Sequence, residues 1–476
     1  MENEIERLEE LCTVLEPSIE EREDLFEEAW KYTQWFLHDL EETHMFHEDL
    51  SKLDLLDKVP IAEHGRSASD TVHLMHAAIH TPGLNPAAPG HFGYIPGGGL
   101  FASAIADYLA ALGNKYAGLF FSAPGAVKAE NQLIRWSAKI LGYPESTYGN
   151  ITSGGSIANL IAVTTAREAK SIAPEQIRKS VIYFSKQTHH CVQKAVNIAG
   201  LGNSIMRQIA LDDRFRMDAS ALAYQVKKDI EEGLIPFFVA ASCGSTDTGA
   251  VDPFDAIAEI AEANNIWFHI DGAYGGYFAL VDELKHLFKG MERSDSVVLD
   301  PHKSLFLPYG SGIVLVREGK KLYDTFECSA NYLQDVISSE DEPSPADLSP
   351  ELTKHFRGLR MWMPLQLYGV APFRNCLYEK YLLTKYFHEE VQKIGFEVGP
   401  EPQLSVGIYR FIPKNEDANT FNAKLVKAIK SDGRVFVSST SIDEVFWLRI
   451  ALVNFRTHKR HVDKYLNILK EMTSSY

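Results

Sequence analysis

The chain has 476 residues, 45% of them hydrophobic and 23% charged, which is typical of a globular protein with a large buried core. Its 47 lysines and arginines against 64 aspartates and glutamates give a net charge of −17. Nucleic acids and anionic membranes bind clusters of Lys and Arg, so this balance disfavours both as partners. The composition favours solubility and leaves the substrate open.

The five cysteines, at positions 12, 191, 243, 328 and 376, are far apart and form no CxxC pair. We therefore expect reduced thiols in the cytoplasm, with neither a disulfide framework nor a zinc site. The acidic start, MENEIERLEELC, lacks the basic and apolar parts of a signal peptide. Because no stretch approaches ~18 uninterrupted apolar residues, no membrane span is expected either.

A first domain is predicted over residues 1–90, and it is helical because apolar residues such as Leu8, Leu11 and Leu15 recur at helical spacing. The Pro- and Gly-rich run at 85–99 then breaks the pattern. Beyond it, short apolar runs alternate with helical patterns; they lie at 181–185, 236–242, 266–271, 296–300 and 312–317. Such strands predict a mainly parallel sheet covered on both faces, an α/β domain over residues 91–375.

Two later regions differ from this pattern. Residues 331–355 are rich in charge, Ser and Pro and show no hydrophobic period, which predicts a mobile functional loop or a disordered one. After residue 375 a long helix at 379–394 precedes the runs LSVGIYRFI, VFVSS and FWLRIALVN. These predict a third, C-terminal α+β domain over residues 376–476.

Lys303 lies in the run DPHKSLFLPYGSG, directly after an apolar strand. At the carboxyl end of a strand in an open α/β sheet, a side chain points into the crevice where ligands bind. Burial there is expected to lower the pKa of the lysine and make it a nucleophile toward carbonyls. The alternative is a lysine at the rim of the loop that caps backbone carbonyls.

Asp271 ends the apolar strand IWFHID and is followed by small residues. A buried carboxylate needs a positive charge, and the ring nitrogen of pyridoxal phosphate supplies one. At ~3 Å and an effective dielectric of ~20 the attraction is roughly 5 kcal/mol before desolvation, enough to keep that nitrogen protonated. The alternatives are a helix cap or a metal ligand, but no neighbouring ligand cluster in the sequence supports a metal.

Two further runs suit a phosphorylated aromatic cofactor. Gly154, Gly155 and Ser156 precede an amphipathic helix, whose N-terminus and exposed backbone N–H groups attract an oxyanion. The run KQTHHCVQKA follows another core strand and offers His189 and His190, one of which is predicted to stack on an aromatic ring. Taken singly, these would be a helix cap and a surface histidine.

In order along the chain, the runs HFGYIPGG, TSGGSIANL, QTHH, GLIPFFVAASCGSTDTGAVD, WFHIDGAYGG, DPHK and FRGLRMW resemble the group II pyridoxal-phosphate decarboxylases of fold type I. This is the family of aromatic amino-acid and glutamate decarboxylases, and the similarity covers about residues 25 to 460. The resemblance implies an aspartate-aminotransferase-like fold with a seven-stranded, mainly parallel sheet. It also implies a homodimer with shared active sites, in which the N-terminal segment packs on the partner.

The resemblance also implies residue roles. Lys303 would bind pyridoxal phosphate as a Schiff base, Asp271 would pair with the pyridine nitrogen, and His189 would stack on the ring. Thr246 and Ala273 would pack around the cofactor. The phosphate would be held by Gly154, Gly155 and Ser156, with Asp300 or His302 nearby. The substrate pocket would be lined, partly from the other subunit, by His91, Phe92, Tyr94 and Pro96.

The implied reaction is decarboxylation of an L-amino acid to its amine. An aromatic substrate is expected, because Gly97, Gly98 and Gly99 would leave room and Tyr94, Tyr116 and Phe120 could present apolar surface. Arg357 and Arg360 keep glutamate or another acidic substrate open, and Arg449 is either a carboxylate partner or part of a structural ion pair. Another fold-type I reaction, such as transamination, is a further alternative.

One departure from the family concerns the last step. A tyrosine on a mobile loop commonly delivers the proton to the α-carbon, but residues 333–355 contain no tyrosine, and Pro345 or Ala346 lies near the usual position. The remaining candidates are His190, His302, His355, a bound water or a tyrosine from elsewhere. Alternatively oxygen reacts in place of the proton, and the product is an aldehyde.

Overall fold

The computed structural model describes residues 1–327 and 342–474, so Cys328 and the first part of the predicted loop lie outside the described residues. The chain forms two compact units, one of Met1–His91 with Ala428–Phe436 and the other of Phe92–Lys427 with Val437–Tyr476. The predicted three-part division at 90/91 and 375/376 stays a prediction. No helix among the described residues is long and apolar enough to cross a membrane.

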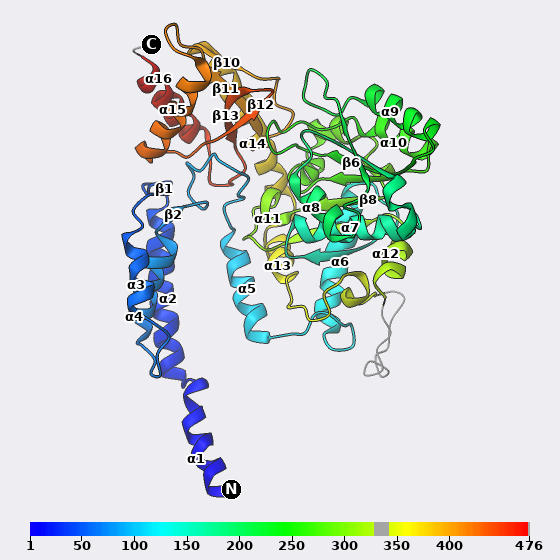
Figure 1. The fold of residues 1–476 in the computed structure, drawn as a ribbon. Coiled ribbons are helices and arrows are strands. Elements are labelled where there is room, and N and C mark those ends of the chain that lie inside the picture. The colour runs from blue at the N-terminus through cyan, green and yellow to red at the C-terminus, as the bar shows by residue number, and fades with distance from the viewer. Residues whose placement is uncertain (328–341, 475–476) are drawn as a thin grey trace. The chain divides into compact units, whose positions relative to one another are not determined.

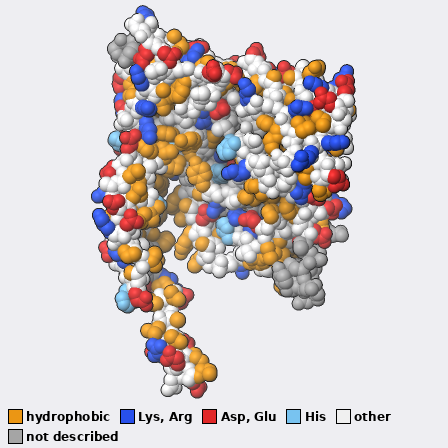
Figure 2. Space-filling view, viewed as in Figure 1, with side chains coloured by type: hydrophobic (Ala, Val, Ile, Leu, Met, Phe, Trp, Pro, Cys, Tyr) orange, Lys and Arg blue, Asp and Glu red, His pale blue; other side chains and the backbone are white. Residues whose placement is uncertain are grey.

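The first unit is mainly helical, as its apolar periodicity predicts (Figure 1). Its elements are α1 (Glu2–Cys12), α2 (Ile19–Asp39), β1 (Phe46–His47), α3 (Asp54–Lys58), α4 (Ala68–Leu74), a π-helical turn (Met75–His80) and β2 (Gly83–Leu84). Ser18 and Glu21 form a capping box that fixes the start of α2. Neither α1 nor α2 contains a buried residue, and apolar side chains stand among the charged ones along these helices (Figure 2).

A seven-stranded sheet forms the centre of the second unit. Its strands are β3 (Tyr148–Thr152), β4 (Ser180–Ser185), β5 (Ile205–Ile209), β6 (Ile235–Ser242), β7 (Trp267–Asp271), β8 (Ser296–Leu299) and β9 (Gly312–Val316). Their order is β3-β9-β8-β7-β6-β4-β5, and β9 alone runs antiparallel to its neighbours. The predicted mainly parallel, seven-stranded sheet of a fold-type I enzyme is therefore confirmed.

Both faces of this sheet are buried, which explains why its strands are almost continuously apolar. In β4 the side chains of Val181 and Tyr183 enter one hydrophobic cluster, while Ile182 between them enters another. The helices around the sheet and before it are α5 (Phe101–Gly113), α6 (Pro124–Ile140), α7 (Gly155–Ala169), α8 (His190–Ile198), α9 (Ala219–Glu231), α10 (Phe254–Ala263), α11 (Pro301–Ser304), α12 (Gly319–Phe326) and α13 (Leu359–Tyr368).

The predicted C-terminal α+β region is confirmed. Its four strands form an antiparallel sheet in the order β10-β11-β13-β12. They are β10 (Phe396–Val398), β11 (Val406–Phe411), β12 (Ser438–Ile442) and β13 (Val445–Ala451). The helices of this part are α14 (Ala371–Lys393), α15 (Ala418–Asp432) and α16 (Lys459–Thr473), and α14 begins earlier than the sequence pattern predicts.

Residues 342–355, the described part of the predicted mobile loop, are packed into the second unit. Pro345 and Leu348 are buried, and Lys354 is only 1% exposed. The Lys354 Nζ lies 2.8 Å from the Glu130 Oε2 on α6 and donates to the Asn150 Oδ1 on β3 at 2.9 Å. A buried charge with two polar partners is costly to expose, so this part is held in place, contrary to the prediction of a mobile loop.

Candidate active site

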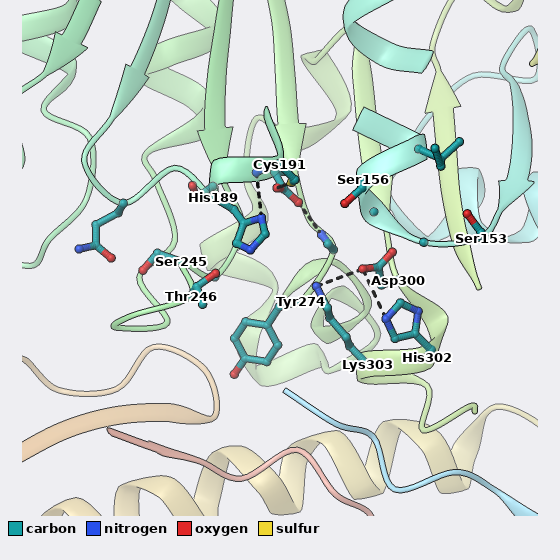
Figure 3. Close-up of a pocket in the computed structure, with 18 residues that line it drawn as sticks. Ser153, Ser156, His189, Cys191, Ser245, Thr246, Tyr274, Asp300, His302 and Lys303 are labelled. Atoms are coloured by element: carbon teal, nitrogen blue, oxygen red, sulfur yellow. Dashed lines mark hydrogen bonds and ion pairs between the residues drawn. The ribbon is translucent and has the colours of Figure 1, made fainter. Parts of the chain in front are cut away.

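A cavity of about 320 Å³ lies beside the carboxyl ends of the parallel strands, where ligands bind in open α/β sheets. The segments that line it follow β3 and the four adjacent strands β4, β6, β7 and β8. Figure 3 shows their side chains around the cavity. The lining residues are Ser153, Gly154, Gly155, Ser156, Ile157, Gln187, His189, Cys191, Ser242, Gly244, Ser245, Thr246, Asp271, Ala273, Tyr274, Asp300, His302 and Lys303. The ten residues expected around the cofactor are therefore brought together.

Lys303 enters the cavity from α11, the short helix that follows β8. Its Nζ lies 3.0 Å from the Asp300 Oδ2. Burial by itself lowers the pKa of Lys303, but the charges of Asp300 and Asp271 outweigh burial and leave this pKa raised. The predicted lowered pKa is thus wrong for the protein without cofactor, because two carboxylates that are distant in sequence share the lysine's cavity.

Asp271 ends β7 and is 8% exposed. Its Oδ1 accepts the backbone N–H of Ala273 at 3.1 Å, and its Oδ2 lies 3.8 Å from the Cys191 Sγ. Among the described residues, no cationic nitrogen forms an ion pair with this carboxylate. A buried carboxylate without a counter-ion suits the protonated nitrogen of a pyridine ring.

His189 lies at the N-cap of α8, and its Nδ1 accepts the backbone N–H of Cys191 at 3.3 Å. Burial lowers the pKa of His189, so its ring is neutral near pH 7 and suited to stacking. The ring centroid of His190 lies 4.1 Å from that of His189, yet His190 is exposed and does not line the cavity.

The glycine-rich run lies at the N-terminus of α7, as expected. Gly154 has φ +153°, and a Cβ at Gly155 would lie 3.0 Å from the Asp300 Oδ2, so both positions favour glycine. The Oδ1 of Asp300 is buried without a hydrogen-bond partner. His302 donates from Nδ1 to the Ser311 carbonyl, and burial lowers its pKa. An orphaned polar atom, a lysine and a helix N-terminus around one cavity fit a phosphorylated aldehyde cofactor.

The expected substrate-pocket residues are not in this cavity. His91 is 2% exposed and stacks on Phe436, while Phe92 is fully buried and meets Tyr465 edge to face. Pro96 is buried as well, but Tyr94 is 56% exposed with φ +51°. The apolar run therefore contributes mainly to the core, and of the four side chains only Tyr94 projects outward.

The glycines and aromatic residues expected to shape the pocket have other roles. A Cβ at Gly97 would lie 2.6 Å from the Lys303 carbonyl oxygen, so this glycine permits close backbone packing and does not create room. Tyr116 donates from its hydroxyl to the Leu352 carbonyl, and the Phe120 backbone N–H donates to the Ser344 Oγ. Both residues thus support the packed segment 342–355.

The three arginines considered for substrate binding differ in their partners. Arg357 pairs with Glu351 at 2.9 Å, and Arg360 pairs with Asp107 at 2.8 Å. Arg449 is buried, donates to the Ser438 Oγ and the Tyr94 carbonyl, and has no hydrogen-bond partner at Nε. No carboxylate among the described residues pairs with it, which contradicts the structural ion pair, and burial lowers its pKa to about 10.

Of the groups considered as proton donors, His302 lines the cavity, whereas His190 and His355 do not. Pro345 is buried, and its carbonyl accepts from the Asn150 side chain at 2.8 Å. Eight lining residues lie outside the ten expected around the cofactor: Ser153, Ile157, Gln187, Cys191, Ser242, Gly244, Ser245 and Tyr274. All eight lie at or shortly after the ends of β3, β4, β6 and β7, and that position is the signal that could have found them.

A family model described as the pyridoxal-dependent decarboxylase conserved domain matches residues 64–411. The chain belongs to this family. It is 32% identical to an aromatic-L-amino-acid decarboxylase of Bacillus atrophaeus, over 86% of each chain. It is also 30% identical to a phenylacetaldehyde synthase of Arabidopsis thaliana, over 81% of this chain and 82% of the relative.

Among solved structures, tryptophan decarboxylase of Catharanthus roseus in complex with L-tryptophan superposes with a TM-score of 0.89 at 25% identity. The match covers 96% of this chain and 99% of that one. The predicted family, fold class and cofactor are therefore confirmed: the protein is a pyridoxal-phosphate-dependent amino-acid decarboxylase.

Proposed function

We propose that this decarboxylase converts an aromatic L-amino acid into its amine in the cavity around Lys303. The observation that carries the proposal is that Lys303 lines the same cavity as Asp271, a buried carboxylate that forms no ion pair among the described residues. The names of relatives support the aromatic class, because they include an aromatic-L-amino-acid decarboxylase and a tryptophan decarboxylase.

The residues around the cavity have complementary roles in this proposal. Lys303 holds the cofactor covalently, Asp271 keeps the pyridine nitrogen protonated, and His189 stacks on the ring. When bound, pyridoxal phosphate supplies the electron sink for the bond that breaks as CO₂ leaves. Thr246 and Ala273 pack around the ring. Gly154, Gly155 and Ser156 at the N-terminus of α7 would hold the phosphate, with Asp300 and His302 nearby.

The substrate's carboxylate and side chain make different demands on the site. Arg357 and Arg360 already pair with acidic residues, so neither is available for the side chain of glutamate, which favours an aromatic substrate. Arg449 is a buried cation that has no carboxylate partner among the described residues, and it is our candidate for binding a substrate carboxylate.

The proton that reaches the α-carbon comes from Lys303 in this proposal. Its Nζ lies 3.0 Å from the Asp300 Oδ2, and neighbouring carboxylates favour the protonated form, so the Nζ would carry a proton next to the substrate whenever it is not bonded to the cofactor. Pro345 has no acidic proton and is packed away from the cavity lining. The same lysine that anchors the cofactor thus replaces the loop tyrosine of the family.

A homodimer completes the substrate pocket. The described lining contains few apolar side chains, whereas α1 and α2 expose large ones, among them Ile5, Leu8, Leu11, Phe26 and Trp30. Exposed apolar surface of this extent marks an interaction site. We place the N-terminal segment 1–90 on the partner subunit, with His91, Phe92, Tyr94 and Pro96 as the run that reaches the shared pocket, of which Tyr94 contacts substrate. The enzyme is proposed to be cytoplasmic.

A second candidate product is the corresponding aldehyde, formed with consumption of O₂ and water and with release of CO₂, ammonia and hydrogen peroxide. The observation that favours it is Pro345, which lies in the sequence near the position where members of the family commonly carry the proton-donating tyrosine. A relative is named phenylacetaldehyde synthase, although the decarboxylases among the relatives support the amine equally well.

Product identification tests these alternatives. The holoenzyme is incubated separately with tyrosine, tryptophan, phenylalanine, dihydroxyphenylalanine and glutamate. Mass spectrometry identifies the products, and an oxygen electrode measures O₂ uptake. We expect an amine and CO₂ from an aromatic substrate, without O₂ uptake. Stoichiometric O₂ consumption with an aldehyde would establish the second candidate, a keto acid would establish transamination, and turnover of glutamate alone would overturn the aromatic assignment.

A further inference from the structure

Three potential metal ligands from different parts of the chain meet on one wall of the cavity. His189 and Cys191 come from the start of α8 (Figure 3). Asp271 comes from the end of β7. One ring nitrogen of His189, the Cys191 Sγ and a carboxylate oxygen of Asp271 all lie within 4.8 Å of one another. The sequence showed no such cluster, because 80 residues separate Cys191 from Asp271.

The distance between two of the three ligand atoms is close to that in a tetrahedral zinc site. Zinc–sulfur and zinc–oxygen bonds of about 2.3 and 2.0 Å at a tetrahedral angle place sulfur and oxygen roughly 3.5 Å apart. The Cys191 Sγ lies 3.8 Å from the Asp271 Oδ2, so this pair needs to move by only a few tenths of an ångström. All three residues line the cavity, which leaves room for a water as the fourth ligand.

A second layer of hydrogen bonds orients the sulfur. The Asn159 Nδ2 donates to the Cys191 Sγ at 3.4 Å and to the Gly155 carbonyl at 2.9 Å. The Oδ1 of Asn159 lies 2.8 Å from the His269 Nε2, which fixes the orientation of the amide. An N–H donor directed at sulfur stabilises a thiolate, and such outer partners are typical of built metal sites.

We infer that, in the absence of cofactor, His189, Cys191 and Asp271 bind a zinc-like divalent cation. Nitrogen, thiolate and carboxylate ligands in tetrahedral arrangement suit Zn²⁺ or Co²⁺ and disfavour Mg²⁺ and Ca²⁺, which require more oxygen ligands. Because cysteine binds zinc as a thiolate, metal binding releases the thiol proton of Cys191 to solvent.

The metal and the cofactor exclude each other. This part of the inference rests on the proposed function, in which His189 stacks on the pyridoxal ring and Asp271 pairs with its nitrogen. A metal that coordinates both side chains occupies those contacts. Zinc then acts as a competitor of cofactor loading, and the cofactor-bound enzyme is insensitive to it.

Cobalt titration of the full-length, cofactor-free chain tests the site directly. We expect one Co²⁺ per chain with a thiolate-to-cobalt charge-transfer band, displacement by Zn²⁺, and slower gain of bound-cofactor absorbance when zinc is present. In Cys191→Ser the band disappears and zinc affinity falls at least tenfold. Mutation of a residue that only hydrogen-bonds a metal ligand already costs about tenfold or more, so loss of a ligand should cost at least as much.

Cys243→Ser is the matched control, because Cys243 is also buried near this edge of the sheet but does not belong to the three-residue cluster. It keeps the cobalt band. Cofactor absorbance after loading in metal-free buffer checks that each variant is folded, and Cys191→Ala provides a second variant with the same expected loss.

An equal cobalt band in wild type and Cys191→Ser would overturn the inference. So would simultaneous binding of cobalt and cofactor to one chain. Both readouts are spectroscopic, so the result does not depend on whether the enzyme decarboxylates an aromatic amino acid.

Discussion

The residues expected around the cofactor and the run His91–Pro96 were both predicted from motifs, yet only the first set lines one cavity. The cavity residues follow the ends of adjacent parallel strands, and that position directs their side chains into one crevice. The run at 91–96 has no such strand to orient it, and His91 and Phe92 are buried in cores. A motif at a strand end thus specifies where its side chains point, whereas the side chains of an apolar motif in a loop are oriented by tertiary packing.

Among the variants that distinguish the two regions, Lys303→Ala is expected to have the largest effect on activity. Without this lysine the cofactor has no covalent attachment, and because nucleophile and proton carrier are lost together we expect kcat to fall by at least ~10³-fold. Borohydride reduction followed by mass spectrometry measures the attachment. A variant that still carried a reducible, covalently bound cofactor would show that the lysine is misassigned.

Lys354→Met tests the packed segment 342–355. The substitution leaves Glu130 buried without its cation, and we expect a loss of ~3–5 kcal/mol in the free energy of unfolding. Denaturant unfolding of the holoenzyme measures it. The double variant Lys354→Met/Glu130→Gln serves as control and should recover part of the loss; limited proteolysis that cleaves wild type within 342–355 would argue against a packed segment.

Phe92→Ala and Tyr94→Ala form a matched pair within the second region. Phe92 is fully buried, so its truncation should cost ~3–5 kcal/mol of stability. Tyr94 is exposed, so its truncation should leave stability within about 0.5 kcal/mol and raise KM for the aromatic substrate. If instead only Phe92→Ala changed KM, Phe92 and not Tyr94 would be the residue that contacts substrate.

The smallest effect concerns pH. Burial lowers the pKa of His91 to about 4, so between pH 6.5 and 4 the unfolded chain binds more protons than the folded one. The contribution of His91 to stability is complete above pH 6.5 and falls by up to ~3 kcal/mol as the pH drops to 4.

His91→Phe preserves a ring for stacking on Phe436 and removes this titration. Its stability should fall less steeply between pH 6.5 and 4 than that of wild type. Some acid sensitivity remains, because burial also lowers the pKa of His269 to about 4. Identical slopes in thermal unfolding curves of the two proteins would contradict the assignment to His91.

Much of the fold was predictable because its strands are short, apolar and separated by helical patterns. Lys303, Asp271, His189 and Gly154–Ser156 were found for the same reason, since each lies where an apolar element ends. The packed segment was mispredicted because its burial depends on a polar contact between Lys354 and Glu130, which leaves no hydrophobic period. The paired states of Arg357 and Arg360 likewise depend on partners elsewhere in the chain.

The sequence by itself determined the enzyme family and the cofactor, and it singled out Lys303 as the proposed attachment point, because strand ends and glycine-rich turns are local features. Tertiary structure decided which of these ends are neighbours. The order β8-β7-β6-β4 brings Asp300 and Asp271 close enough to raise the pKa of Lys303, and it places Cys191 beside Asp271. Electrostatic interaction and metal coordination depend on distances of a few ångströms, and those distances follow from strand order and not from spacing along the chain.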